Sequence, residues 1–217
     1  MVIQKDPKIK HSMAYYRIEG GKPLSGTVTT TSGKNSPVAL MCATLLIEGV
    51  TRLRDVARVE EVDRLIELLT SIGVAVSWED RHTLVIDATG PLTLDSIDRV
   101  ACGRMRISLL LMGALAKREQ SFRVYKTAGC KLGNRSIRPH VLALAKLGII
   151  VTSHEGYYQV DAREMHSARV VMYESGDTAT ENAILGAIYA KGTTTITFAS
   201  ANYMVQDLCY FLVNAGA

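Results

Sequence analysis

Long apolar runs, aromatic residues and closely spaced cysteines are all scarce in this chain of 217 residues. No stretch approaches eighteen consecutive apolar residues, so we expect no membrane-spanning helix. The N-terminal stretch MVIQKDPKIKHSMAYY carries charges without an apolar centre and does not resemble a signal peptide. Aromatic residues make up only 6% and do not alternate with lysine and arginine, which argues against a nucleic-acid-binding surface. We therefore expect neither a membrane nor a nucleic acid as a partner.

The cysteines, at positions 42, 102, 130 and 209, show no C-x-x-C spacing, which argues against a zinc site. No other metal constellation is visible, and nothing in the sequence calls for a cofactor. Cys42 and Cys209 lie in apolar helical runs, as packed thiols do. A reducing, cytoplasmic location fits this pattern best.

Apolar residues make up 47% of the chain, charged residues 21%, and the net charge of +4 is spread along it, all ordinary for a globular protein. Ser36 can cap a helix with Pro37 at its first position, and this helix, to about residue 47, is apolar on every face. A strand at 50–56 follows, then an amphipathic helix at 59–71 that ends at Gly73, then a hairpin at 74–87.

The same order of elements returns twice. The second copy has a helix near 104–117, a strand at 122–125, a helix at 140–148 and a hairpin at 149–161; the third has a helix at 180–192, a strand at 194–198 and a helix at 207–216. The glycines that close the second helices, Gly73, Gly148 and Gly216, are 75 and 68 residues apart. We therefore predict three repeats, at about 34–95, 96–165 and 166–217, of which the third is incomplete.

Three copies of one α/β unit, each with an all-apolar helix, favour pseudo-threefold packing with those helices buried and the sheets facing outward. This three-repeat domain is predicted to span residues 33–217. Before it, residues 1–14 are polar and aperiodic, which predicts a loose arm. Short strands are expected at 15–18 and 27–31, within a segment 15–32.

One loop stands out chemically, the stretch from Lys126 to His140, which reads KTAGCKLGNRSIRPH. It places Cys130 between two glycines and among four cations, Lys126, Lys131, Arg135 and Arg138. Nearby cations favour thiolate and lower the pKa of a thiol below its free value of about 8.5. The pattern fits chemistry on an anionic substrate, and it equally fits a basic surface loop with an incidental cysteine.

Four motifs, in the right order, carry a resemblance to a known family. They are TSGKNS at 31–36, GRMRIS at 103–108, GCKLGNR at 129–135 and TATEN at 178–182. Each resembles a stretch of the UDP-N-acetylglucosamine 1-carboxyvinyltransferase family of enolpyruvyl transferases: SGAKNA, MRAS, GCxIGxR and GATEN. The resemblance covers residues 17–217 without large gaps.

The resemblance implies an inside-out α/β barrel and two domains of three repeats each, with the active site between them. The implied reaction moves the enolpyruvyl group from phosphoenolpyruvate to the 3-hydroxyl of UDP-N-acetylglucosamine and releases phosphate, the first committed step of peptidoglycan precursor synthesis. Family members are about twice as long, so the chain is expected to be an N-terminal half, inactive alone. The segment 15–32 would then belong to the C-terminal domain that is absent here.

The resemblance also implies residue roles. Lys34, also assigned a catalytic part, and Arg135 would bind phosphoenolpyruvate, with Arg106 helping to hold the ligands. Asn35 would hold the region of the sugar hydroxyl, and Cys130 would deliver a proton to the enolpyruvyl methylene carbon. Guanidinium and ammonium groups suit a phosphate and a carboxylate. Without the resemblance, Arg106 could equally be a solvated charge at a helix start.

The match is weaker on the side of the acceptor nucleotide. After the arginine of the cysteine loop the family usually reads PVDLH, whereas this chain reads SIRPH, with Arg138 and His140 as candidate binding residues. The family's SVG is Gly176-Asp177-Thr178 here, which makes Asp177 and Thr178 further candidates, and its REPE is Ala201-Asn202-Tyr203-Met204. His140 could also simply flank a helix. A different nucleotide acceptor, or a non-catalytic anion-binding relative, are therefore alternatives.

Overall fold

The computed structural model describes residues 20–21, 23–28, 30, 32–126 and 136–217. The chain divides into a short N-terminal unit that ends at Thr30 and a large unit, Thr31–Ala217. The strand expected at 15–18 lies outside the described residues, and residues 27, 28 and 30 belong to no strand. The boundaries at 14 and 32 stay predictions.

The first repeat follows the predicted order of elements. They are α1 (Asn35–Ala43), the 3-10 turn η1 (Thr44–Leu46), β1 (Val50–Leu53), α2 (Glu60–Ser71), β2 (Ala75–Trp78) and β3 (Leu84–Asp87). The strands form an antiparallel sheet in the order β1-β3-β2, and Asp87 pairs with both Val50 and Ala75. The last strand of the repeat, β3, is therefore the central one, and the β2-β3 hairpin joins the sheet by pairing β3 with β1.

The second repeat has the same topology. Its elements are η2 (Leu94–Ser96), α3 (Arg99–Arg104), η3 (Arg106–Leu110), α4 (Leu111–Ala114), β4 (Ser121–Tyr125), α5 (Arg138–Lys146), β5 (Ile150–Ser153) and β6 (Tyr157–Asp161). Its sheet order is β4-β6-β5, and Asp161 pairs with both Ser121 and Ile150. The two sheets are therefore built alike, strand for strand.

The third repeat contains α6 (Asp177–Ala187), β8 (Thr195–Thr197) and α7 (Tyr203–Asn214). Its strand pairs in parallel with β7 (Arg169–Val171), which the sequence patterns did not predict. The glycines that close α2, α5 and α7, at positions 73, 148 and 216, all have positive φ. A left-handed residue of this kind ends a helix by bonding back to its last carbonyls, so the predicted helix ends are confirmed.

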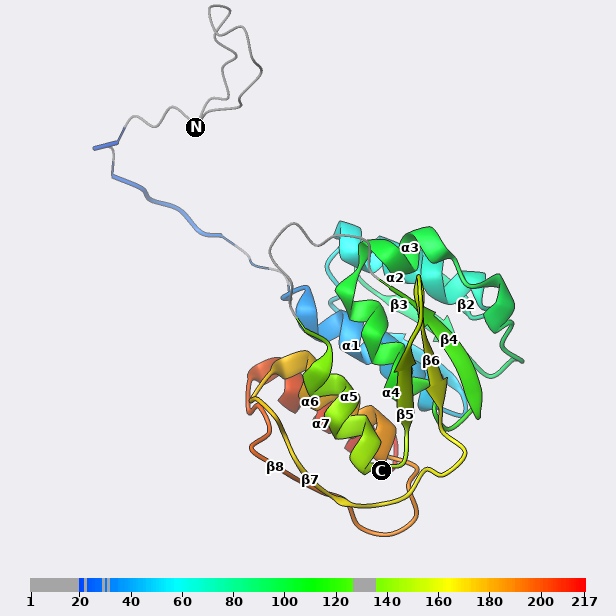
Figure 1. Ribbon diagram of the computed structural model, residues 1–217. Coiled ribbons are helices and arrows are strands. Elements are labelled where there is room, and N and C mark those ends of the chain that lie inside the picture. Colours follow the sequence, from blue (N-terminus) through cyan, green and yellow to red (C-terminus); the bar gives the residue numbers. More distant parts are fainter. Residues whose placement is uncertain (1–19, 22, 29, 31, 127–135) are drawn as a thin grey trace, which may run out of the picture. The chain divides into compact units, whose positions relative to one another are not determined.

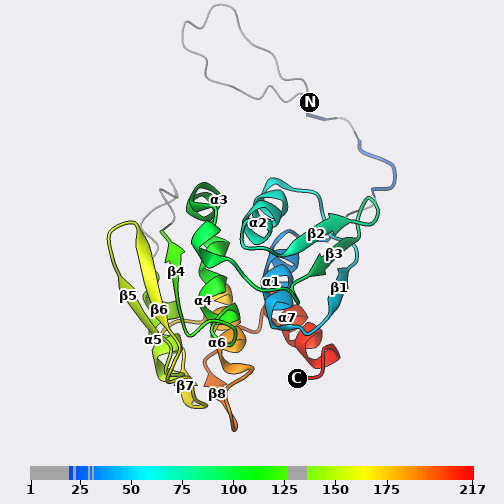
Figure 2. The same ribbon diagram turned by 90° about the vertical axis from the view of Figure 1, so that its right-hand side faces the viewer.

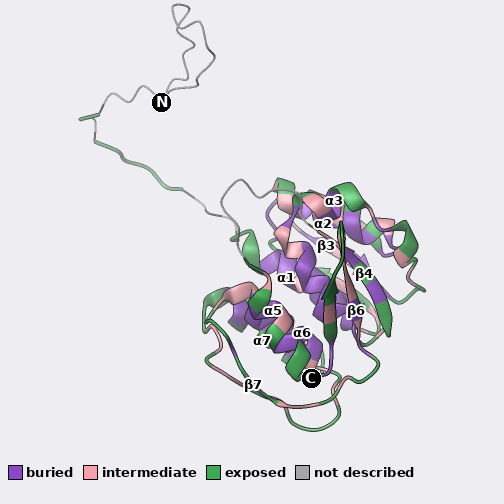
Figure 3. Ribbon diagram, in the orientation of Figure 1, coloured by how far each residue is buried: buried purple, intermediate pink, exposed green. Residues whose placement is uncertain are grey.

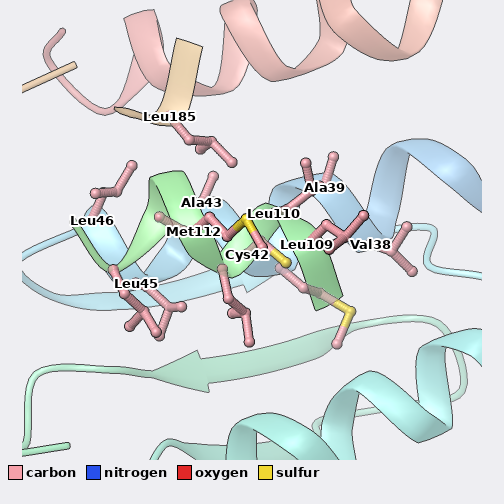
Figure 4. Packing of buried hydrophobic residues seen from close by; sticks show 14 of the residues in the cluster. Val38, Ala39, Cys42, Ala43, Leu45, Leu46, Leu109, Leu110, Met112 and Leu185 are labelled. Atoms are coloured by element: carbon pink, nitrogen blue, oxygen red, sulfur yellow. The ribbon is translucent and has the colours of Figure 1, made fainter. Parts of the chain in front are cut away.

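The first helices of the repeats form the core. Seven of the nine residues of α1 are buried, as are all four of α4 and seven of the eleven of α6. Figure 2 shows these helices between the two three-stranded sheets, and Figure 3 shows the buried residues concentrated on them. Figure 4 shows Ala39 and Cys42 of α1 beside Leu109 and Leu110, with Leu185 of α6 across from them. The helices without a polar side are thus the buried ones, as predicted.

Three local predictions were wrong. Cys42 is buried as predicted for a packed thiol, but Cys209 is exposed. The first helix begins at Asn35 rather than after Ser36, and the Ser36 hydroxyl donates to Asp207 of α7 instead of capping its own helix. The continuous helix expected near 104–117 is broken at Met105, whose backbone is extended. Beyond it the Ser108 hydroxyl donates to the carbonyls of Cys102 and Met105. Arg106 starts η3, the turn that leads from α3 into α4, both of which are labelled in Figure 1.

Candidate functional site

A cavity of about 800 Å³ lies where several helices begin. Its lining comes from the first turns of α1, η3, α5, α6 and α7 and from the segment before α6. The lining residues are Asn35, Arg106, Ile107, Ser136, Arg138, Pro139, His140, Tyr173, Glu174, Ser175, Gly176, Asp177, Thr178, Ala179, Glu181 and Met204. The repeated topology brings these helix starts to one place, because the first helix of each repeat enters the core from the same end.

The start of α6 offers backbone N–H groups to this cavity. Gly176 at its cap position has no side chain that could bond to them. At the start of α5, by contrast, the N–H of Arg138 is bonded to a side chain and Pro139 has no N–H. The first N–H groups of a helix have no partner within the helix, and the helix dipole places positive potential there, so the start of α6 favours an anionic ligand.

Two guanidinium groups add positive charge to the same wall. Arg106 Nη2 donates to the carbonyl of Ser136 at 2.9 Å, which ties η3 to the residue just before α5. Arg138 lies over the ring of Tyr173, with 5.1 Å from its guanidinium carbon to the ring centroid. The backbone N–H of Arg138 also donates to Ser136 Oγ at 3.0 Å. Both arginines are therefore positioned by contacts within the wall, as a site for phosphate or carboxylate requires.

A buried amide supports this wall from behind. Asn182 on α6 accepts the N–H of Gly113 on Oδ1 at 2.8 Å, and its Nδ2 donates to the Leu109 carbonyl at 2.9 Å. The same Nδ2 lies 3.1 Å from His140 Nδ1, which must therefore accept, so the imidazole proton is on Nε2. Burial, and secondly Arg106, lower the pKa of His140 to about 4. His140 is neutral at pH 7 and links α5 to α6.

The opposite side of the cavity carries acids. Asp177 Oδ1 accepts from Ser200 Oγ at 2.5 Å, and its Oδ2 accepts from Asn202 Nδ2 at 3.2 Å. Glu181, one turn further along α6, is only 1% exposed. Burial, and secondly the charge of Asp177, raise the pKa of Glu181 to about 7. The cavity therefore has a cationic wall at η3 and α5 and an acidic wall at α6.

Six of the predicted site residues line this cavity: Asn35, Arg106, Arg138, His140, Asp177 and Thr178. Lys34 does not line it; its ammonium instead pairs with Glu61 at the start of α2. Cys130 and Arg135 lie outside the described residues, in the segment that directly precedes the cavity's Ser136. The roles predicted for these residues stay predictions.

Sequence reasoning missed Glu181, Tyr173 and Ser136 in this lining. Glu181 had a usable signal, because it is a lone carboxylate in an apolar helix and follows Asp177 at a spacing of four. Tyr173 and Ser136 had none, since their positions depend on how separate elements pack. No group of three or more His, Cys, Asp and Glu residues within the described ranges could hold a metal ion.

Comparison with known families shows which family the chain belongs to. The family model for EPSP synthase (3-phosphoshikimate 1-carboxyvinyltransferase) matches residues 18–217. The chain belongs to the EPSP synthase family of enolpyruvyl transferases. Within this family it is 38% identical over 202 residues to the UDP-N-acetylglucosamine 1-carboxyvinyltransferase of Bradyrhizobium diazoefficiens, covering 93% of this chain and 46% of that protein. The enzyme of the same name from Chlorobium chlorochromatii is 34% identical, covering 92% of this chain and 48% of that protein.

This member of the EPSP synthase family thus spans about half the length of the curated relatives it matches. Solved structures share its mixed α/β fold. The enolpyruvyl transferase NikO from Streptomyces tendae superposes with a TM-score of 0.73 at 22% identity, covering 89% of this chain and 45% of that one. An EPSP synthase from Acinetobacter baumannii gives 0.67 at 17% identity, covering 86% and 44%. In the described part of the chain, every helix is too short or too polar to cross a membrane.

Proposed function

We propose that this chain forms one wall of the active site of an enolpyruvyl transferase. The enzyme would transfer the enolpyruvyl group of phosphoenolpyruvate to the 3-hydroxyl of UDP-N-acetylglucosamine, with release of phosphate, for peptidoglycan precursor synthesis. The single observation that carries this is the cavity at the starts of α5 and α6, where Arg106 and Arg138 lie together. Both substrates are anions, and this wall is built from groups that bind anions.

In this proposal the loop that contains Cys130 supplies the catalytic acid. Cys130 and Arg135 belong to the segment between β4 and α5, which continues into Ser136 of the cavity lining. Arg135 and Lys34 would bind phosphoenolpyruvate, with Arg106 helping to hold the ligands and Asn35 near the sugar hydroxyl. A thiol tuned by neighbouring cations would protonate the methylene carbon, which leaves the adjacent carbon open to attack by the acceptor hydroxyl.

A second wall would complete the site. The chain covers 46% and 48% of two relatives that carry the proposed activity in their names. We infer an inside-out α/β barrel in each of two domains, with the active site between them. The partner domain would come from the same protein, and residues 15–32 would pack with it. On this basis, the 217 residues alone would bind phosphoenolpyruvate without turning it over.

A different nucleotide acceptor is a second candidate, and one contact favours it. Asp177 and Asn202 both stand where the sequence departs from the family pattern, and they are hydrogen bonded to each other. Two departures that meet at one wall of the cavity indicate a coordinated change on the acceptor side. The reaction type therefore has stronger support than the identity of the acceptor.

Alkylation of Cys130 tests the proposal directly. The background variant Cys209→Ser removes the exposed thiol, and Cys42 and Cys102 are buried, so labelling then reports Cys130. We expect phosphoenolpyruvate to slow alkylation of Cys130 and Arg106→Ala to weaken that protection; Cys130→Ser gives the unlabelled baseline. If Cys130 instead reacts like an ordinary thiol and phosphoenolpyruvate does not protect it, the result would favour a non-catalytic relative of the family. Release of phosphate from phosphoenolpyruvate at an enzyme-like rate, when this chain is given both substrates, would contradict the two-wall arrangement.

A further inference from the structure

Glu181 combines two properties that rarely occur together. It lies in the second turn of α6 with only 1% of its surface exposed, and it nevertheless lines the cavity. Its Oε1 atom is buried and has no hydrogen-bond partner within the part of the chain that the structure describes. Buried polar atoms in natural proteins are nearly always paired, so an unpaired one at a cavity points to a partner that arrives with a ligand.

The surroundings of Glu181 decide its protonation state. The charged and titratable groups on the elements around it are Asp177 on α6, Cys42 on α1, Arg106 on η3, Arg138 and His140 on α5, and Glu174 before α6. Asp177 accepts two hydrogen bonds, which hold its carboxylate one turn away from Glu181, where its charge opposes a second negative charge. Together with burial, this charge raises the pKa of Glu181 to about 7.

We propose that Glu181 is a ligand-binding group whose protonated carboxyl donates a hydrogen bond through Oε1 to an anionic oxygen, so that binding takes up a proton. The cationic wall and the uncapped start of α6 attract an anion, which an ionised Glu181 would repel. Bringing an anion beside the carboxyl therefore favours its protonated form. The identity of this anion as a phosphorylated substrate rests on the proposed function; the proton coupling does not.

Calorimetry with sulfate tests the coupling, because sulfate remains a dianion throughout the range used. Titrations of the full chain at pH 8, in two buffers of different ionisation enthalpy, give the number of protons taken up per sulfate bound. We expect uptake by the parent and none by Glu181→Gln, which keeps the shape of the side chain but cannot titrate. Between pH 7 and 9 the parent should lose up to about tenfold in affinity relative to Glu181→Gln, the effect of a one-unit rise in pKa on binding.

Several results would overturn the proposal: equal uptake by Glu181→Gln, release of a proton, or no binding of sulfate. Release would mean that the bound anion favours the ionised form of a group in the site, the opposite of what the proposal requires. A parallel titration with phosphoenolpyruvate separates the two proposals. If sulfate binding takes up a proton but phosphoenolpyruvate does not bind, the proposed function is contradicted and the role of Glu181 stands. If phosphoenolpyruvate binds and Glu181→Gln takes up as many protons as the parent, the role of Glu181 is contradicted and the proposed function stands.

Asp177→Asn provides a second, independent variant. It removes the neighbouring negative charge while it keeps an acceptor for Ser200, so the pKa of Glu181 should fall and the pH window of uptake should move lower. If Glu181→Gln fails to fold, as judged by circular dichroism, this shift still decides the question. An unchanged window in Asp177→Asn would overturn the proposal.

Discussion

His140 and Glu181 should give the stability of the protein two opposing pH dependences. Burial lowers the pKa of His140 from 6.5 to about 4, so the unfolded chain binds a proton first as pH falls. Stability from this residue is full above pH 6.5 and is lost as pH falls toward 4. Burial raises the pKa of Glu181 from 4.5 to about 7, so its contribution is full below pH 4.5 and is lost as pH rises toward 7.

Both shifts are of similar size and opposite sign, and both side chains are at most 2% exposed. At 1.36 kcal/mol per pKa unit, each is equivalent to about 3 kcal/mol, and in the parent the two slopes largely cancel between pH 4.5 and 6.5. Glu181→Gln should therefore expose the His140 slope, and stability should rise by about 2–3 kcal/mol from pH 4.5 to 7. His140→Asn should expose the opposite slope, with stability falling over the same range.

Urea unfolding at half-unit pH intervals measures these slopes, with the free energy of unfolding taken from the midpoint and the m-value. The control is Glu155→Gln, an exposed carboxylate in a turn, which should reproduce the parent's profile. If Glu181→Gln and the parent differ by a constant amount at every pH, Glu181 is ionised in the folded protein and the reasoning is refuted.

Three further predictions follow from individual contacts. Asn182→Ala removes the side-chain partner of the Gly113 N–H and of His140 Nδ1, and one of the bonds to the Leu109 carbonyl, so it should cost about 3–5 kcal/mol in urea unfolding, whereas the exposed Asn214→Ala should cost under about 0.5. Gly113→Ala places a methyl group 2.5 Å from the Asn182 carbonyl oxygen and should cost about 2–3 kcal/mol, whereas Gly90→Ala meets nothing within 4 Å and should be nearly neutral; equal costs would contradict the close crossing of α4 and α6. Glu61→Gln breaks an exposed ion pair, so it should change stability by under about 1 kcal/mol, yet tighten phosphoenolpyruvate binding if Lys34 is a ligand, as calorimetry would show.

The sequence was most informative where structure depends on local pattern. The apolar run after Ser36 and the glycines at 73, 148 and 216 predicted buried helices and helix ends that the structure contains. Apolar periodicity and left-handed glycines act within one element, so they can be read without knowing its neighbours. The break at Met105 and the strand β7 could not be read this way. At Met105 the backbone becomes extended between two helical turns, which no apolar period marks, and β7 is defined by its pairing with β8.

The same division applies to the candidate site. A motif identified Arg106 as a site residue, because a guanidinium group suits an anionic substrate whatever its surroundings, and a departure from the family pattern identified Asp177. They did not identify Glu181, whose role depends on burial, nor the pairing of Lys34 with Glu61, which depends on where α2 begins. A sequence pattern indicates which groups are present, while their protonation and pairing are set by packing.

Asp177 shows how one departure from the family pattern can change more than one property of the site. Ser200 and Asn202 donate hydrogen bonds to its two oxygens, which hold the carboxylate in place at the start of α6. From there its charge helps raise the pKa of Glu181, one turn deeper in the cavity. A family member with an apolar residue in this place lacks that charge, so a carboxylate at the position of Glu181 would titrate lower and repel an anion more strongly at neutral pH. The residue at position 177 therefore also affects the protonation of Glu181, and the two carboxyl groups of the cavity lining are coupled through their charges.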